Sequence, residues 1–108
     1  MILAIDVGNT NIVLGCIEDG DIRSIVRIQT NPGETAAEYA IKLKQILEIY
    51  DISPRAFEGA IISSVVPPLT NSLKEAVRKL TGIECLVVGP GMRTGMNVRI
   101  DDPGTLAG

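Results

Sequence analysis

The chain has 108 residues, of which 45% are hydrophobic and 21% are charged, and this composition is typical of one small globular domain. Ten basic and thirteen acidic residues give a net charge of −3, which argues against a surface that collects nucleic acid or anionic lipid. The first fifteen residues lack a basic segment and carry Asp6 inside the apolar run. This pattern argues against a secretory signal and a membrane span, so we expect a cytoplasmic protein.

The sequence contains two cysteines and no histidine. Cys16 and Cys85 each lie in an apolar run, which predicts two buried free thiols rather than a disulfide. Without histidine, the chain offers little from which to build a zinc site.

The first 29 residues predict three strands that follow one another in an antiparallel meander. Residues 2–7 form a short β-branched apolar run that Gly8 and Asn9 end, and residues 12–17 form a second one. A polar turn at residues 18–21 then leads to residues 22–29, where apolar residues at 22, 25, 26 and 28 predict a half-buried strand.

The second part of the chain predicts two helices alternating with two strands. The residues at 30–33 break the third strand, and helical spacing predicts a helix over residues 34–50 whose apolar positions form core packing, at Ala36, Ala37, Ala40, Ile41, Leu43, Ile46, Leu47 and Tyr50. Residues 59–66 are an apolar run of strand length. Pro67 and Pro68 end that run and open a helix over about residues 69–80, and residues 84–88 form a fifth strand after Gly82.

This β-β-β-α-β-α-β order predicts an α/β fold of the ribonuclease H-like kind, with helices packed on a mixed sheet. The same unit is the shared half-domain of the actin-like ATPases and sugar kinases. We therefore expect residues 1–108 to form one such domain. Residues 89–108 are rich in Gly and Pro and show no obvious packed element, which is typical of a functional or incomplete segment.

The turn after the first strand carries the residues best suited to chemistry. A carboxylate such as Asp6 at the end of a buried strand needs a cation or hydrogen bonds to compensate it, and a Mg²⁺ ion that carries phosphate is one such partner. Gly8 allows close approach of a phosphate, while Asn9, Thr10 and Asn11 supply donors. The alternative, that these residues only stabilise a hairpin turn, remains open.

Two other kinds of site are disfavoured. The turn has no Lys and joins two strands, which excludes a P-loop. Ser63 and Ser64 have neither a histidine base nor a Gly-x-Ser-x-Gly elbow, so they are interpreted as a strand end and helix start, although they could also line a substrate pocket. Arg93 and Arg99 could meet an anionic ligand, but solvated surface arginines are commoner.

Three stretches in family order resemble the type III pantothenate kinases. They are residues 6–11 (Asp-Val-Gly-Asn-Thr-Asn), residues 63–67 (Ser-Ser-Val-Val-Pro), and residues 89–103, with Gly-Pro-Gly, Thr-Gly-Met and Asp-Asp-Pro. The resemblance implies an actin-like fold of two similar domains. It also implies ATP-dependent phosphorylation of pantothenate to 4′-phosphopantothenate, the first step of coenzyme A biosynthesis, by a homodimer that uses Mg²⁺ and a monovalent cation such as K⁺ or NH₄⁺.

The resemblance also implies roles for particular residues. The ATP-binding loop of the family corresponds to Asp6, Val7, Gly8, Asn9, Thr10, Asn11, Ile12 and Val13, with Asp6 at the metal. Ala107 and Gly108 reach the start of the Gly-x-Asp-Arg motif that binds pantothenate. The catalytic Asp of that motif is expected beyond Gly108. We therefore expect an amino-terminal half that lacks the second domain and has no turnover alone.

The sequence leaves two alternatives to the kinase. One is a non-catalytic accessory factor for transcription, which some proteins of this family are described as being. The other is an interaction module that has kept the ribonuclease H-like core and lost nucleotide binding. The intact turn from Asp6 to Asn11 argues against the second.

Overall fold

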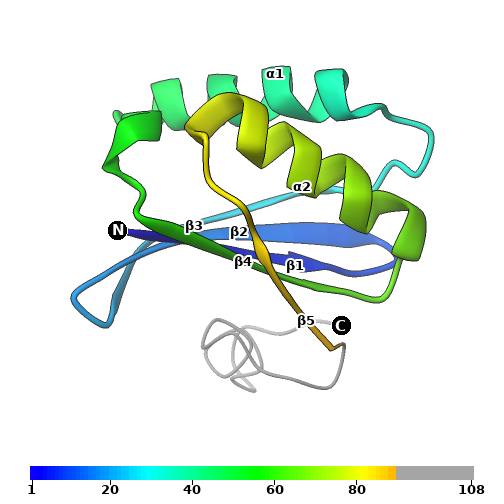
Figure 1. The fold of residues 1–108 in the computed structure, drawn as a ribbon, viewed down its shortest axis with the longest axis horizontal. Coiled ribbons are helices and arrows are strands. Elements are labelled where there is room, and N and C mark those ends of the chain that lie inside the picture. The colour runs from blue at the N-terminus through cyan, green and yellow to red at the C-terminus, as the bar shows by residue number, and fades with distance from the viewer. Residues whose placement is uncertain (90–108) are drawn as a thin grey trace.

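The computed structural model of the protein describes residues 1–89 and contains all seven predicted helices and strands (Figure 1). In chain order they are β1 (Ile2–Val7), β2 (Asn11–Glu18), β3 (Asp21–Gln29), α1 (Ala36–Ile49), β4 (Gly59–Ser64), α2 (Pro67–Thr81) and β5 (Leu86–Val88). A short 3-10 helix, η1 (Pro54–Ala56), was not predicted. The order of elements predicted from the sequence is confirmed.

The five strands form one mixed sheet in the order β3-β2-β1-β4-β5. β1 pairs antiparallel with β2, and β2 pairs antiparallel with β3. β4 pairs parallel with both β1 and β5. The two helical crossovers, from β3 through α1 to β4 and from β4 through α2 to β5, step in the same direction across the sheet, and crossovers of one hand then place their helices on one face. Both α1 and α2 indeed lie against the same face of the sheet (Figure 1).

The core lies between this face and the two helices. Side chains alternate along β1, so that Leu3, Ile5 and Val7 join the main core while Ala4 packs with Val13 on the opposite face. The fully buried side chains of the main core come from both layers: Tyr39, Ile5, Ile12, Ile62, Leu69, Leu73 and Val77. This packing holds the ends of the strands in place against the two helices.

The prediction for the buried face of α1 was partly wrong. Ile41 is 59% exposed and Tyr50 is 48% exposed, whereas Tyr39, which was not among the predicted positions, is completely buried. The buried face runs through Tyr39, Leu43 and Leu47 at four-residue spacing, and Ile41 lies away from it. Apolar character alone does not decide which face of a helix is buried, because only the row of side chains that faces the core packs against it.

The ends of the helices follow from specific residues. α1 begins two residues later than predicted because Thr35 caps it: its hydroxyl accepts from the Glu38 N–H at 3.2 Å, and the Glu38 carboxylate accepts from the Thr35 N–H at 2.7 Å. α2 begins earlier than predicted, at Pro67, because proline suits the first helical turn. It ends at Gly82, whose φ of 79° is left-handed.

The two cysteines are free and buried, as predicted. Burial raises the pKa of the Cys16 thiol, and it raises the pKa of Cys85 to about 11. Both thiols are therefore protonated and poorly reactive at neutral pH. Among residues 1–89, no helix is long and apolar enough to cross a membrane.

Candidate functional site

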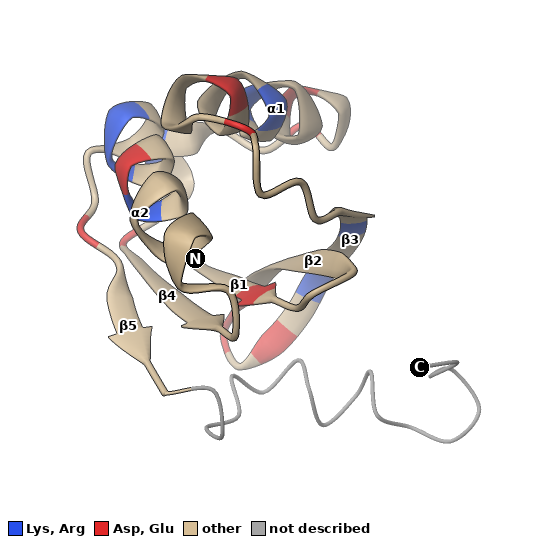
Figure 2. Cartoon of the chain, turned by 90° about the vertical axis from the view of Figure 1, so that its right-hand side faces the viewer, with Lys and Arg blue, Asp and Glu red and all other residues tan. Residues whose placement is uncertain are grey.

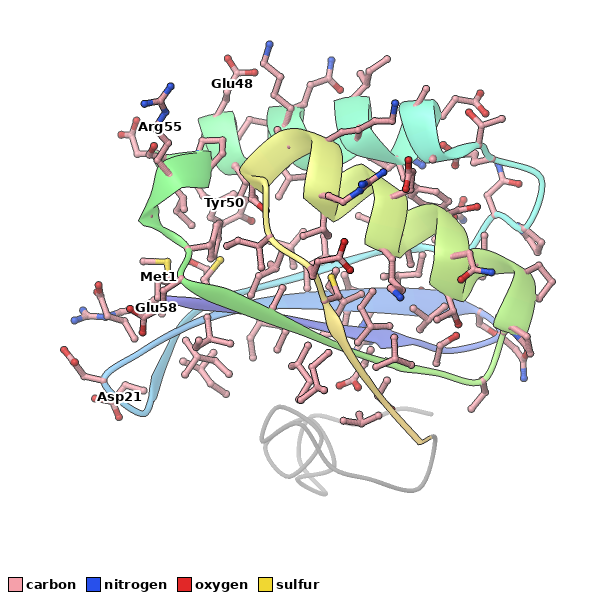
Figure 3. All side chains as sticks on the ribbon, viewed as in Figure 1. Met1, Asp21, Glu48, Tyr50, Arg55 and Glu58 are labelled. Carbon is pink, nitrogen blue, oxygen red and sulfur yellow. The ribbon has the colours of Figure 1, made fainter. Side chains whose placement is uncertain are left out.

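The predicted site lies at the end of the sheet where β1 and β4 finish and where both helices begin. The turn of residues 8–10 follows β1, residues 30–35 connect β3 to α1, and residues 65–66 connect β4 to α2. The Val65 N–H donates to the Val7 carbonyl at 3.0 Å, which joins the third connection to the end of β1. Figure 3 labels Met1, Asp21 and Glu58 at the other end of the sheet.

The turn itself is tightly closed. The Gly8 N–H donates to the Asn11 carbonyl at 2.9 Å. A Cβ atom added to Gly8 would lie 3.1 Å from that same carbonyl oxygen, which is closer than ordinary packing allows. The turn itself therefore favours glycine here, because a larger residue would push the Asn11 carbonyl away by a few tenths of an ångström, in addition to any close approach of a ligand that the sequence suggested.

The predicted nucleotide-binding residues divide by exposure. Asn9 and Thr10 are exposed and Asn11 is half-buried, so the side chains of these three can present donors to a ligand, whereas half-buried Gly8 uses its N–H within the turn. Val7 and Ile12 are buried in the main core, and Val13 is buried on the opposite face of the sheet. Only main-chain atoms of these three apolar residues are suited to hold a phosphate.

Asp6 is half-buried and lies next to the end of β1, on the face of the sheet opposite the helices. The sheet register aligns it with Val13 of β2 and with Ser63 of β4. Ser63 is buried, and its hydroxyl donates to the Gly89 carbonyl at 3.4 Å. Asp6 therefore lies at the carboxyl end of β1, beside the turn that carries the phosphate-type donors.

The chemistry of this carboxylate fits a metal that arrives with its own ligands. In the part of the chain that is described, no group of three or more His, Cys, Asp or Glu side chains could hold a metal ion. Mg²⁺ in phosphoryl-transfer sites is held by one or two carboxylates, with water and substrate phosphates supplying the rest. A single carboxylate such as Asp6 can hold Mg²⁺ only together with water or phosphate ligands.

Ser64 takes the structural role that the sequence predicted. Its hydroxyl accepts from the Val66 N–H at 3.0 Å and lies 3.1 Å from the Val66 carbonyl, which it can donate to. This local bonding ends β4 two residues before the predicted end and turns the chain into α2. The interpretation of Ser64 as part of a strand-to-helix turn is confirmed.

Thr30 contacts the turn and was missed at the level of sequence. Its hydroxyl donates to the Gly8 carbonyl at 2.7 Å, and its N–H donates to the Thr10 carbonyl at 2.9 Å. The sequence showed Thr30 only as the start of a break after the third strand. Only the observed pairing of Asn11 with Gln29, which places residue 30 opposite residue 10, reveals its contact with the turn.

Two hollows are lined by residues other than those of the predicted site. One is a cavity of about 20 Å³ in the apolar core, lined by residues such as Leu3, Cys16 and Leu80, at the end of the sheet away from the turn. The other, of about 280 Å³, lies along α2, where Arg78 donates to Glu75 at 2.9 Å. Figure 2 shows acidic and basic positions side by side on both helices, as expected for solvated surfaces.

Several predicted residues lie outside the described part of the chain. These are the substrate-binding residues Ala107 and Gly108, together with Arg93 and Arg99. The third family-like stretch lies there too, except for Gly89.

Several solved structures share this fold. A hexokinase of the ROK type from Thermus thermophilus has a TM-score of 0.58 over 82% of this chain and 34% of its own, at 14% identity. A Bacteroides thetaiotaomicron protein of actin-like ATPase fold has a TM-score of 0.51 over 93% of this chain and 37% of its own, at 12% identity. T. thermophilus RuvC also has a TM-score of 0.51, over 82% of this chain and 64% of its own, at 16% identity. The predicted ribonuclease H-like, actin-like ATPase fold is confirmed.

The sequence comparison then defines the family. The model of the type III pantothenate kinase family matches residues 2–107, so the chain belongs to that family. A type III pantothenate kinase from Bifidobacterium animalis subsp. lactis is 44% identical over 98% of this chain and 42% of its own. One from Bifidobacterium adolescentis is 40% identical over 95% of this chain and 40% of its own. The chain spans about two fifths of the length of these relatives.

Proposed function

We propose that this chain is the phosphate-binding, amino-terminal half of an enzyme that transfers phosphate from ATP to the hydroxyl of pantothenate. This reaction yields 4′-phosphopantothenate and opens coenzyme A biosynthesis. The observation that carries the proposal is the turn from Asp6 to Asn11, which joins a half-buried carboxylate to exposed donors at the carboxyl end of β1. Membership of the type III pantothenate kinase family supports the choice of substrate.

The residues of the turn would act by positioning and by neutralising charge, which are what phosphoryl transfer needs most. Asp6 would hold Mg²⁺ directly or through water, and this metal would supply charge neutralisation at the phosphates. The main-chain N–H groups of Asn9 and Thr10, with the side chains of these two residues, would bind phosphate oxygens. This half of the protein would therefore orient ATP.

Both helices add to this arrangement, since their amino termini lie at the same end of the sheet as the turn (Figure 1). The amino terminus of a helix carries partial positive charge and favours a nearby anion. α2 begins directly after Ser64, Val65 and Val66, and Val65 is bonded to the end of β1. The dipole of α2 would strengthen the attraction of the site for phosphate.

The remaining parts of the reaction are proposed from the family alone. Ala107 and Gly108 would lead into the Gly-x-Asp-Arg motif, whose Asp would take the proton from the attacking hydroxyl and whose Arg would help to bind pantothenate. A second domain of similar fold, a homodimer and a monovalent cation such as K⁺ or NH₄⁺ would complete the enzyme. The greater length of the curated relatives is consistent with a second domain.

The test combines two measurements on the natural polypeptide: its intact mass, and its ATP- and Mg²⁺-dependent phosphorylation of pantothenate followed by mass spectrometry of the product. A polypeptide of about the relatives' length that forms 4′-phosphopantothenate would support the proposal. A folded protein of that length without turnover would refute it and would favour a non-catalytic accessory factor instead.

A further inference from the structure

The turn of residues 8–10 is held from outside by the segment that follows β3. Thr30 lies 22 residues from Gly8 in the sequence, yet its hydroxyl donates to the Gly8 carbonyl at 2.7 Å. Its N–H donates to the Thr10 carbonyl at 2.9 Å. One residue thus holds both ends of the three-residue turn through side chain and main chain.

These two bonds set the direction of the neighbouring amide groups. The C=O and N–H of a trans peptide point in opposite directions, and none of the described peptide bonds is cis. Because the Gly8 carbonyl is directed at Thr30, the Asn9 N–H is directed away from Thr30. The same argument applies to the Thr10 carbonyl and the Asn11 N–H. Thr30 therefore directs the Asn9 N–H to the side of the turn away from β3, whereas the Asn11 N–H lies on the β1 side of β2, as does the Asn11 carbonyl that accepts from Gly8.

Thr30 is in turn anchored to the core through its neighbour. The Tyr39 hydroxyl donates to the Asn31 carbonyl at 3.0 Å, and it accepts from the Asn31 N–H at 3.2 Å. Tyr39 is completely buried in the first turns of α1. A rigid helix thus fixes Asn31, Asn31 fixes the adjacent Thr30, and Thr30 fixes the turn.

We propose that Thr30 is a positioning residue for nucleotide binding, because it holds the peptide between Gly8 and Asn9 so that the Asn9 N–H is directed away from β3 and can donate to a phosphate oxygen. The inference rests on the proposed function of the turn. A preorganised donor set binds phosphate without ordering itself first, so loss of the Thr30 hydroxyl weakens the binding of Mg²⁺-ATP more than it slows later steps.

The experiment uses the full-length protein and three variants. Thr30→Val removes the hydroxyl and keeps the shape and the N–H, while Thr30→Ser restores the hydroxyl. Thr81→Val is the matched control, because the Thr81 hydroxyl also donates to a carbonyl at 2.7 Å, that of Val77, but at the end of α2 away from the turn. The readouts are KM for Mg²⁺-ATP, KM for pantothenate, kcat, and the dissociation constant of Mg²⁺-ATP by calorimetry.

We expect Thr30→Val to raise KM and Kd for Mg²⁺-ATP by about three- to tenfold, the loss typical of one hydrogen bond, with KM for pantothenate unchanged. Thr30→Ser should restore nucleotide binding to within about twofold, and Thr81→Val should leave it unchanged. Nucleotide binding by Thr30→Val within twofold of wild type would overturn the proposal. So would an equal loss in Thr81→Val, or a failure of Thr30→Ser to recover.

Amide hydrogen exchange at Gly8 separates this inference from the proposed function. The Gly8 N–H is bonded across the turn to Asn11, so a loosened turn should exchange it faster in Thr30→Val than in Thr81→Val. A protein that binds Mg²⁺-ATP normally but never phosphorylates pantothenate would refute the function and leave the role of Thr30 standing. Unchanged Gly8 exchange in Thr30→Val would refute that role whatever the activity.

Discussion

Replacing Tyr39 with Phe removes one hydroxyl from the centre of the connection between α1 and the turn. The ring is completely buried and remains in place, and the Lys42 ammonium 5.3 Å from its centre keeps the same partner. The change therefore isolates two hydrogen bonds, those to the N–H and the carbonyl of Asn31. Any loss of stability reports on these bonds rather than on packing.

The stability lost in Tyr39→Phe depends on which hydrogen bonds the main-chain groups of Asn31 retain. The Asn31 carbonyl still accepts from the Glu34 N–H at 3.1 Å, whereas the Asn31 N–H loses the Tyr39 oxygen. Asn31 is exposed, so water can reach the freed groups and reduce the penalty. With about 0.5–1.5 kcal/mol for each net hydrogen bond, we expect a loss of about 1–2 kcal/mol in the free energy of unfolding.

Urea unfolding of the full-length protein measures this loss, with an unchanged m value as the sign that the unfolded state is unaltered. Tyr50→Phe is the matched control, because Tyr50 is 48% exposed and the same change there should cost less than about 0.5 kcal/mol. Figure 3 shows Tyr50 at the far end of α1 from the turn. If Tyr39→Phe were as stable as Tyr50→Phe, the anchoring of Asn31 by α1 would be wrong.

Two further predictions concern the turn and the buried thiol. Gly8→Ala should lower turnover of the full-length protein, because the new Cβ would lie 3.1 Å from the Asn11 carbonyl. Gly33→Ala is the control and should have wild-type kinetics, because its Cβ meets only a side-chain oxygen at 3.5 Å. Equal kinetics for the two variants would contradict the argument that the Cβ at residue 8 crowds the turn. Burial raises the pKa of Cys85 from its ordinary 9.0 to about 11, so the stability that it contributes is present below pH 9 and is lost as the pH rises towards 11. Between pH 7.5 and pH 10, wild type should therefore lose on the order of 1 kcal/mol more unfolding free energy than Cys85→Ala; parallel losses would mean that Cys85 does not titrate in this way.

The sequence predicted the elements of the fold well because each depends on a local pattern. Apolar runs of strand length, helical spacing, and the prolines before α2 are all readable without knowledge of neighbours. The predictions are wrong where burial depends on how a helix lies against the sheet. Ile41 and Tyr39 are both apolar enough to be buried, and only the position of the sheet selects Tyr39.

The residues of the candidate site also differ in whether the sequence alone could reveal them. The turn from Asp6 to Asn11 is contiguous, so its residues could be found from the sequence together. Thr30 could not, because its contacts depend on the register between β2 and β3, which includes an irregularity between Cys16 and Ile17. A residue that acts through hydrogen bonds across 22 positions becomes visible only once strands are paired.

The central claim, that the turn binds the Mg²⁺ and phosphates of ATP for transfer to pantothenate, is tested most directly by the Mg²⁺-dependent turnover of Asp6→Asn in the full-length protein. Asp21→Asn is the control, because Asp21 is exposed in the β2–β3 hairpin at the other end of the sheet. With both variants folded by circular dichroism, we expect kcat/KM to fall by about a hundredfold in Asp6→Asn and to stay at wild type in Asp21→Asn. Wild-type turnover in Asp6→Asn would remove Asp6 from the mechanism and leave the turn a structural feature of the fold.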